Sequence, residues 1–204
     1  MFIKFKKATN LIFALLLMSG LFWPLGGKNV AVYADGEPEA MDIIAEADSY
    51  VRADSPTTNF GNSSSLLAQN GIGSTSPFPV FSYLRFQLPE YDPEQVILYI
   101  YNKGINNESF DVYFVSDSTW SEYSITYQNK PSLGDGIASG VIPAMSWIGI
   151  NVTDYVVAND TVSFAIAHNG ASVLELSSRE VVDEEPFLRV NPVTPIKCDI
   201  ICPP

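Results

Sequence analysis

The chain contains four arginines, and each lies in a segment whose residue pattern predicts a β-strand: Arg52, Arg85, Arg179 and Arg189. A guanidinium within a strand needs an anionic partner, and its planar fork matches a carboxylate. Two interpretations are open. The arginines are structural if each pairs with a nearby acid such as Asp48, Glu122 or Glu180. They are functional if several converge with Lys103 or Lys130 into a basic groove that holds sugar carboxylates or sulfates.

Aromatic side chains would complete such a groove, because a flat ring stacks on the apolar face of a pyranose while polar neighbours bind its hydroxyls. Tyr99 and Tyr101 share one face of a predicted strand, and Tyr113 and Trp147 lie in two others. For each of them a place in the core is the alternative, and Trp120 is the aromatic residue most expected there. The candidate ligand-binding residues are therefore Arg52, Arg85, Lys130, Arg179, Tyr99, Tyr101, Tyr113 and Trp147.

Acidic residues form a second candidate site. Glu46 and Asp48 begin the first predicted strand of the domain, and Glu180 and Asp183 lie near the last two. If the terminal strands lie side by side, these carboxylates gather into a set of hard oxygen ligands suited to Ca²⁺. The alternative is a solvated acidic loop, since no spacing of the kind found in EF-hands fixes the ligands.

Catalytic motifs are missing from the sequence. His168 is the only histidine, and it ends a predicted strand before Asn169-Gly170, where we expect it to be exposed. The chain has no Gly-x-Ser-x-Gly motif, no phosphate-binding glycine loop with a lysine, and no zinc-binding histidine pair. Two carboxylates would suffice for glycoside cleavage, but a chain with 23 acidic residues always offers such pairs. We therefore expect a protein that is not an enzyme.

The first 34 residues resemble a secretory signal peptide. Lys4, Lys6 and Lys7 precede an apolar run, and Val32-Tyr33-Ala34 has the small residue typical of a cleavage site. Secretion is thus expected, with no stable membrane insertion of the mature chain. Removing residues 1–34 takes away four lysines and no acid, so the net charge falls from −12 to −16. This charge disfavours nucleic acid and anionic lipid as partners.

The remaining sequence predicts an all-β domain. Short apolar segments are separated by turn clusters such as Asn70-Gly71, Asn102-Lys103-Gly104 and Asn169-Gly170. This spacing favours a single jelly-roll-type β-sandwich of about nine to ten strands over residues 46–191. The continuous apolar run 96–101 predicts a strand buried on both faces. A short helical turn is expected from Thr153 to Ala158, with Thr153 as its N-cap.

Two segments flank the predicted sandwich. Residues 35–45 are small and acidic and are expected to be a linker, and residues 192–204 form a Pro-rich tail. The tail holds the only two cysteines, Cys198 and Cys202. Outside the cell they are expected to form a disulfide that closes a small ring, with unpaired thiols as the alternative.

Short motifs follow one another from Ala47 to about Asn191, and together they resemble the DNRLRE domain, also called carbohydrate-binding module family 96 and related to disaggregatase repeats. None is specific by itself, but their order and spacing are. They are Ala47-Asp48-x-Tyr50-Val51-Arg52, Asn59-x-Gly61, Tyr83-Leu84-Arg85-Phe86, Trp120-x-Glu122-x-x-Ile125-Thr126-Tyr127, Lys130-Pro131, Val152-Thr153-x-x-Val156 and Ser178-Arg179-Glu180.

This resemblance implies a β-sandwich that binds polysaccharide, with alginate-type uronic acid polymers as the characteristic ligands. Family members are usually attached to large secreted lyases or hydrolases. This sequence departs from that pattern because it shows no catalytic domain, so the module is expected to stand alone or to dock to a separate secreted protein. Three hypotheses remain. An exposed row of aromatic residues beside an arginine would favour a polysaccharide-binding module. A smooth acidic surface with every arginine buried against an acid would favour a structural or adhesive module of the envelope or matrix. A deep cleft with two carboxylates would favour a glycan-degrading enzyme.

Overall fold

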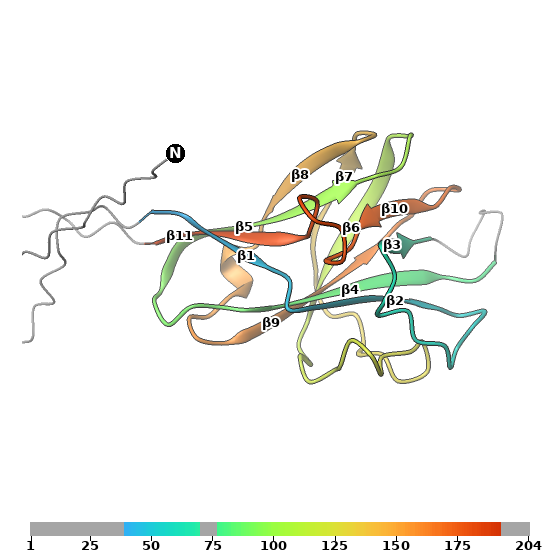
Figure 1. Ribbon diagram of the computed structural model, residues 1–204, viewed down its shortest axis with the longest axis horizontal. Coiled ribbons are helices and arrows are strands. Elements are labelled where there is room, and N and C mark those ends of the chain that lie inside the picture. Colours follow the sequence, from blue (N-terminus) through green and yellow to red (C-terminus); the bar gives the residue numbers. More distant parts are fainter. Residues whose placement is uncertain (1–38, 70–76, 193–204) are drawn as a thin grey trace, which may run out of the picture. The chain divides into compact units, whose positions relative to one another are not determined.

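The protein folds as two antiparallel β-sheets packed face to face (Figure 1). The structure is a computed structural model that describes residues 39–69 and 77–192. Within these residues it contains eleven strands, one 3₁₀-helix and no α-helix, and it has no helix long and apolar enough to cross a membrane. The predicted signal peptide and both cysteines lie outside the described residues. The all-β sandwich expected from the sequence is confirmed.

Each sheet draws its strands from distant parts of the chain. Sheet A has the order β1 (Met41–Ile44), β11 (Phe187–Pro192), β5 (Pro93–Asn102), β10 (Leu174–Ser177) and β3 (Ser65–Ala68), and β8 (Ser146–Asn151) also pairs with β5. Sheet B has the order β2 (Ala47–Arg52), β4 (Val80–Gln87), β9 (Thr161–Ala167), β6 (Glu108–Val115) and β7 (Gly136–Ile142). From β2 to β6 the chain changes sheet at every connection, as in a jelly roll.

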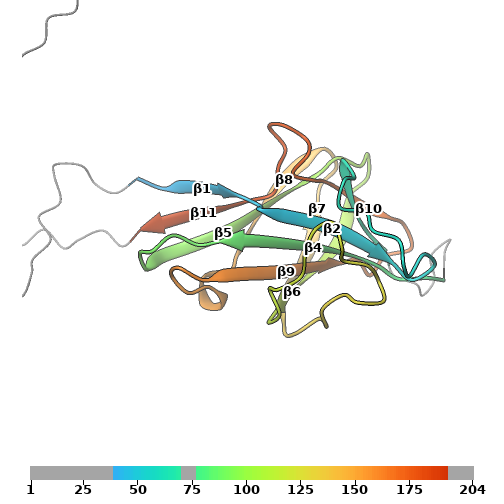
Figure 2. The same ribbon diagram turned by 60° about the horizontal axis from the view of Figure 1, so that its bottom comes forward.

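Strand β1 corrects the prediction of a linker over residues 35–45. Residues 41–44 pair with β11, with Met41 opposite Val190 and Ile44 opposite Phe187. The acidic residues around Pro38 obscured a short apolar segment in which Ile43 packs against the core and the following Ala45 is buried. The first and last strands therefore lie side by side and antiparallel (Figure 2).

The main core lies between the sheets and follows the alternation seen in the sequence. Leu84 and Phe86 of β4 and Val96, Leu98 and Ile100 of β5 are buried within it. The run 96–101 was predicted to be buried on both faces, and this is wrong. Its other positions, Ile97, Tyr99 and Tyr101, are only half-buried, because they point away from the core to the outside of sheet A.

The expected helical turn is shorter than predicted and has a different cap. A 3₁₀-helix spans Thr153–Tyr155, and Val152, not Thr153, is its N-cap. The Thr153 hydroxyl oxygen instead accepts a hydrogen bond of 2.9 Å from the Val96 backbone N–H. The threonine thus ties this turn to strand β5.

The outer faces of the two sheets differ. Residues of the loop between β6 and β7 pack on the outside of sheet B, where Trp120 and Ile125 form a second hydrophobic cluster with Val51, Tyr83 and Ala165. The Trp120 Nε1–H donates to Ser163 Oγ at 3.1 Å. Trp120 is therefore a core residue, as the sequence predicted.

Candidate functional site

Each of the four arginines forms an ion pair with a different acid. The pairs are Arg52 with Asp54 at 2.7 Å, Arg85 with Glu46 at 2.6 Å, Arg179 with Glu122 at 3.0 Å, and Arg189 with Asp42 at 2.7 Å. The two candidate lysines have other partners: Lys103 Nζ lies 4.0 Å from Glu175, and Lys130 Nζ lies 4.4 Å from the centre of the Tyr127 ring. These pairs match the structural interpretation of the arginines.

Arg85 holds the loop that covers sheet B. Besides Glu46, its guanidinium donates to the Trp120 carbonyl oxygen, and it lies over the Trp120 ring at 5.2 Å from the ring centre. Arg52 lies at the other end of the same strand pair, since Ala47 faces Arg85 while Arg52 faces Val80. Neither arrangement leaves a shared basic groove.

Arg179 and Glu122 connect three segments. Arg179 Nη1 donates to both Glu122 carboxylate oxygens at 3.0 Å, and the Arg179 backbone N–H donates to Asp48 Oδ2 at 2.7 Å. The Asp48 backbone N–H in turn donates to Glu122 Oε1 at 3.0 Å. The segment after β10, strand β2 and the loop between β6 and β7 are thereby joined around one buried carboxylate.

The Asn59-x-Gly61 motif supports the same loop. Asn59 Nδ2 donates to the carbonyl oxygens of Glu122 at 2.7 Å and Ile125 at 2.8 Å. Gly61 packs so closely that a Cβ atom there would lie 2.2 Å from the Glu122 carbonyl oxygen. The motif therefore requires an amide side chain at one position and no side chain at the other.

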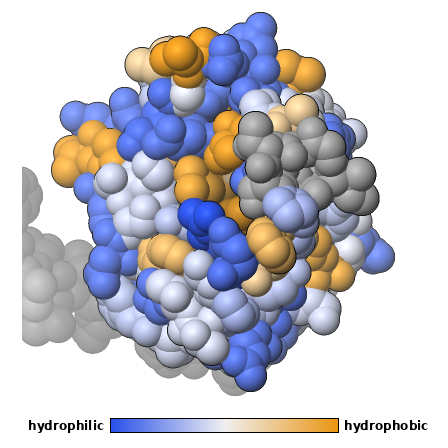
Figure 3. Space-filling view, turned by 90° about the vertical axis from the view of Figure 1, so that its right-hand side faces the viewer, coloured by the Kyte–Doolittle hydropathy of each residue, from blue (hydrophilic) through white to orange (hydrophobic). Residues whose placement is uncertain are grey.

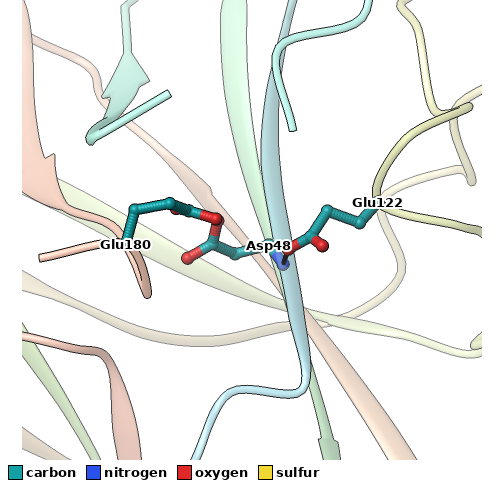
Figure 4. A group of neighbouring side chains, drawn as sticks. All are labelled: Asp48, Glu122 and Glu180. Carbon is teal, nitrogen blue, oxygen red and sulfur yellow. Dashed lines mark hydrogen bonds between the residues drawn. The ribbon is translucent and has the colours of Figure 1, made fainter. Parts of the chain in front are cut away.

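An acidic cluster surrounds this junction. Ligand atoms of Asp48, Glu122 and Glu180 all lie within 4.8 Å of one another, and in Figure 4 Asp48 lies between the other two with its carboxyl group facing that of Glu180. The pKa of Asp48 is raised to about 8, mainly by burial and also by the charges of Glu180 and Glu122, while the hydrogen bond from the Arg179 amide lowers it. A proton or a bound cation would relieve this repulsion.

This cluster differs from the calcium ligands expected from the sequence. Asp48 and Glu180 are brought together as expected, but Glu46 is paired with Arg85 and Asp183 is outside the cluster. Glu122 contributes the third carboxylate, and it comes from the loop between β6 and β7, which is distant in sequence from both Asp48 and Glu180. Three carboxylates suit a hard cation, and Arg179 already balances the charge of Glu122.

His168 is buried, with 3% of its surface exposed, so the expectation of an exposed strand-end histidine is wrong. Its Nδ1 lies 2.6 Å from the Ser109 carbonyl oxygen and therefore carries a proton, while Nε2 lies 3.6 Å from Glu108 Oε2. A protonated Nδ1 cannot accept the proton of the Ser109 hydroxyl, 3.1 Å away. The arrangement thus lacks the serine–histidine hydrogen bond of a nucleophilic triad.

A different group of side chains lies on the outside of sheet A, and we call it the outer strip: Tyr99, Tyr101, Trp147, Phe187 and Arg189. They come from three adjacent strands, β8, β5 and β11. The strand register places Trp147 directly opposite Tyr101 and Phe187 directly opposite Tyr99. Two of the three aromatic candidates that meet here, Tyr99 and Tyr101, were placed on one face by the sequence.

The rings of the outer strip contact one another in a chain. Tyr99 and Phe187 stack with their centres 4.8 Å apart, Phe187 meets Trp147 edge to face at 5.4 Å, and Trp147 meets Tyr101 at 5.3 Å. The Arg189 guanidinium lies 5.3 Å from the Tyr99 ring centre and 5.5 Å from that of Phe187. Trp147 is 38% exposed. The result is an aromatic surface with an arginine at one side.

Gly149 makes room for this surface. It lies opposite Tyr99 on β8, and a Cβ atom there would lie 3.0 Å from Tyr99 Cε1 and 3.2 Å from Cζ. The Tyr99 ring therefore leans over the glycine. Such aromatic–glycine pairs across strands use the space left by the missing side chain.

Tyr113 does not join the outer strip. It lies on β6 of sheet B and lines a shallow hollow of about 330 Å³ with residues of β7 such as Gly136 and Ile137. Phe187 was missed by the sequence reasoning, and Arg189 was not among the candidate ligand residues. The pairing of β11 with β5 places Phe187 opposite Tyr99 and Arg189 opposite Ile97, and the sequence alone does not reveal this pairing.

Figure 3 shows one end of the molecule. Hydrophobic residues there are divided into several groups by hydrophilic ones. Single exposed apolar residues of this kind are normal for a globular domain.

One comparison with known proteins identifies a family. The model of carbohydrate-binding module family 96 matches residues 39–192. Among solved structures, the K3 cleaved adhesin domain of Lys-gingipain from Porphyromonas gingivalis W83 is similar, with 12% identity, a TM-score of 0.34, and coverage of 76% of this chain and 99% of that one. The K1 cleaved adhesin domain of the same protein has 10% identity and the same score and coverage. No curated protein matches the sequence.

Proposed function

Because the chain belongs to carbohydrate-binding module family 96, we propose that it binds a polysaccharide on the outer strip and does not cleave it. The observation that carries this proposal is the row of Tyr99, Tyr101 and Trp147 with Phe187, beside Arg189. Aromatic rings stack on sugar faces, and a nearby guanidinium donates hydrogen bonds to sugar oxygens. Non-catalytic binding is what membership of this family supports.

Two kinds of glycan, acidic and uncharged, are candidates for the ligand. An acidic polymer such as alginate is one candidate, since Arg189 is the group of the strip that could meet a uronate. A cell-wall glycan without charge is the other, and it would depend on stacking and on hydrogen bonds to hydroxyls. Salt would weaken binding of the first and leave the second nearly unchanged.

Affinity electrophoresis through gels that contain soluble polysaccharides tests the proposal. The wild-type protein is expected to be retarded by at least one polymer, and Trp147→Ala is expected to lose about tenfold in affinity, as for a central aromatic contact. Tyr123→Ala is the matched control, because Tyr123 is 63% exposed but lies in the loop over sheet B. Retardation that is unchanged in Trp147→Ala would remove the outer strip as the site.

A protein partner is the second candidate for this face. Met41 and Ile44 of the edge strand β1 are 43% and 54% exposed, and Ile44 lies opposite Phe187. Apolar residues at this position would suit docking to a separate secreted protein or a structural role in a matrix. Failure of every polysaccharide to retard the wild-type protein would favour this candidate.

We also propose secretion and a structural calcium ion. Residues 1–34 would direct export, and sequencing the N-terminus of the protein from culture medium would test this. The acidic cluster of Asp48, Glu122 and Glu180 would hold Ca²⁺ through carboxylate oxygens. A rise in melting temperature with CaCl₂ that is reversed by EGTA supports it, and the same rise in Glu180→Gln contradicts it.

A further inference from the structure

The charged groups around the outer strip are already neutralised. Arg189 Nε and Nη2 donate to the two oxygens of Asp42, each at 2.7 Å, so that one fork of the guanidinium is filled. The pair is partly open to solvent, with side-chain exposures of 43% for Arg189 and 46% for Asp42. A carboxylate of a ligand would therefore compete with a carboxylate that the protein itself supplies.

The next cation along the same face is paired as well. Lys103 comes directly after β5, two residues beyond Tyr101, and its Nζ lies 3.1 Å from Ser65 Oγ and 4.0 Å from Glu175 Oε1. The whole chain carries a net charge of −12. An anionic sugar on the outer strip would thus meet no uncompensated positive charge from Arg189 or Lys103, and it would enter a negative field.

The guanidinium is nevertheless held in a position that suits neutral oxygens. It lies over the Tyr99 and Phe187 rings at 5.3 and 5.5 Å, and Asp42 fixes its orientation. A guanidinium has five N–H donors and Asp42 uses two of its nitrogens, so further donors remain for sugar hydroxyls. Hydroxyl groups can accept these bonds without separating Arg189 from Asp42.

We infer that the outer strip binds uncharged glycans and that Asp42 is the residue that sets this selectivity. The inference rests on the proposed function of the strip. The ligand class is a neutral polymer whose pyranose rings present an apolar face to the aromatic residues. Asp42 neutralises Arg189 and repels uronates, so it determines which glycan binds without needing to touch the sugar itself.

The experiment compares hydroxyethylcellulose and galactomannan with alginate and polygalacturonate in affinity gels at low and high NaCl. The wild-type protein is expected to be retarded by a neutral polymer, with little effect of salt, and less by the two uronates. Asp42→Asn keeps the size of the side chain and removes its charge. It is expected to gain about fivefold in affinity for a uronate at low salt, the size of an exposed charge pair, and to lose the gain at high salt.

Asp54→Asn is the matched control, because it frees Arg52, which is not part of the outer strip. It is expected to gain no affinity for uronates. Strong wild-type retardation by uronates and by no neutral polymer overturns the inference, as does an Asp42→Asn variant that still binds a neutral polymer but gains nothing for uronates. Asp42→Ser repeats the test without an amide. Absence of retardation by all four polymers instead removes the proposed function, and this inference with it.

Discussion

The outer faces of the two sheets are built from similar residues but differ in what covers them. On sheet B, the loop between β6 and β7 lies over Tyr83 and Val51, and Arg85 and Arg179 hold that loop through Trp120 and Glu122. On sheet A, the aromatic residues and Arg189 stay at the surface. Most of the sequence motifs belong to the covered face. The residues that make the family recognisable are thus largely those that fasten a loop, and the proposed binding residues lie elsewhere.

Replacing one tryptophan on each face tests this comparison most strongly. Trp120→Ala is expected to lower the free energy of unfolding by about 3–5 kcal/mol, because it empties a buried site and breaks the hydrogen bond to Ser163. Trp147→Ala on the open face is expected to cost about 1 kcal/mol or less. Urea unfolding measures both. Similar losses for the two variants would mean that the faces are not organised differently.

The pH dependence of stability tests how strongly burial affects the carboxyl group of Asp48. The pKa of Asp48 is about 8 in the folded protein and 3.8 as a free group, so the folded state binds its proton more tightly. Stability is therefore expected to be greatest below pH 4 as far as this group is concerned, and to fall by about 2–4 kcal/mol as the pH rises toward 8. Urea unfolding between pH 4 and 9 with EDTA measures this.

Asp48→Asn is the control for this titration. An amide oxygen can still accept the hydrogen bond from Arg179, but it carries no charge. The slope of stability against pH is expected to flatten in this variant. A wild-type slope that persists in Asp48→Asn would assign the dependence to another group.

Arg85→Ala tests whether Arg85 holds the loop between β6 and β7 or contacts the glycan. It is expected to lower stability by about 1–3 kcal/mol, because it removes the bonds to the Trp120 carbonyl oxygen and to Glu46. Binding of the folded protein to a polysaccharide gel is expected to be unchanged. Loss of retardation without loss of melting temperature would instead place Arg85 in the ligand site.

Gly149→Ala tests the open face of sheet A, where it makes a small change beside Tyr99 of the outer strip. The added Cβ atom would lie 3.0 Å from Tyr99 Cε1, so the ring must shift away from the strand. We expect affinity for the glycan to fall about threefold to tenfold, with a stability change of about 1 kcal/mol or less. Gly136→Ala, whose Cβ atom would lie 3.7 Å from Tyr113, is the control that should affect neither.

Local patterns in the sequence predicted most of the strands, because alternation and turn residues act over a few positions. The sequence predicts strands at 136–142, 146–152 and 161–168, and β7, β8 and β9 match these predictions to within one residue. Strand β1 was missed because four residues beside acidic neighbours carry little periodic signal. Its pairing with β11 joins residues almost 150 positions apart, which no local pattern reveals.

The candidate sites show the same limit. Tyr99 and Tyr101 were placed on one face correctly, since side chains in a strand alternate. Phe187 was missed, because its neighbour Tyr99 is fixed by the register between β5 and β11. Glu122 was assigned to an arginine, but its place in the acidic cluster depends on how the loop folds back over β2.

The pairing of β1 with β11 has a mechanical consequence. The start of β1 and the end of β11 lie at the same end of this strand pair. A force that pulls these two ends apart would therefore break the Met41–Val190 pair first and then each following pair in turn. A ladder loaded in this way resists far less force than one that is sheared. Peeling β1 would also carry Asp42 away from Arg189, so tension along the chain would change the charge that the sheet offers to its surroundings.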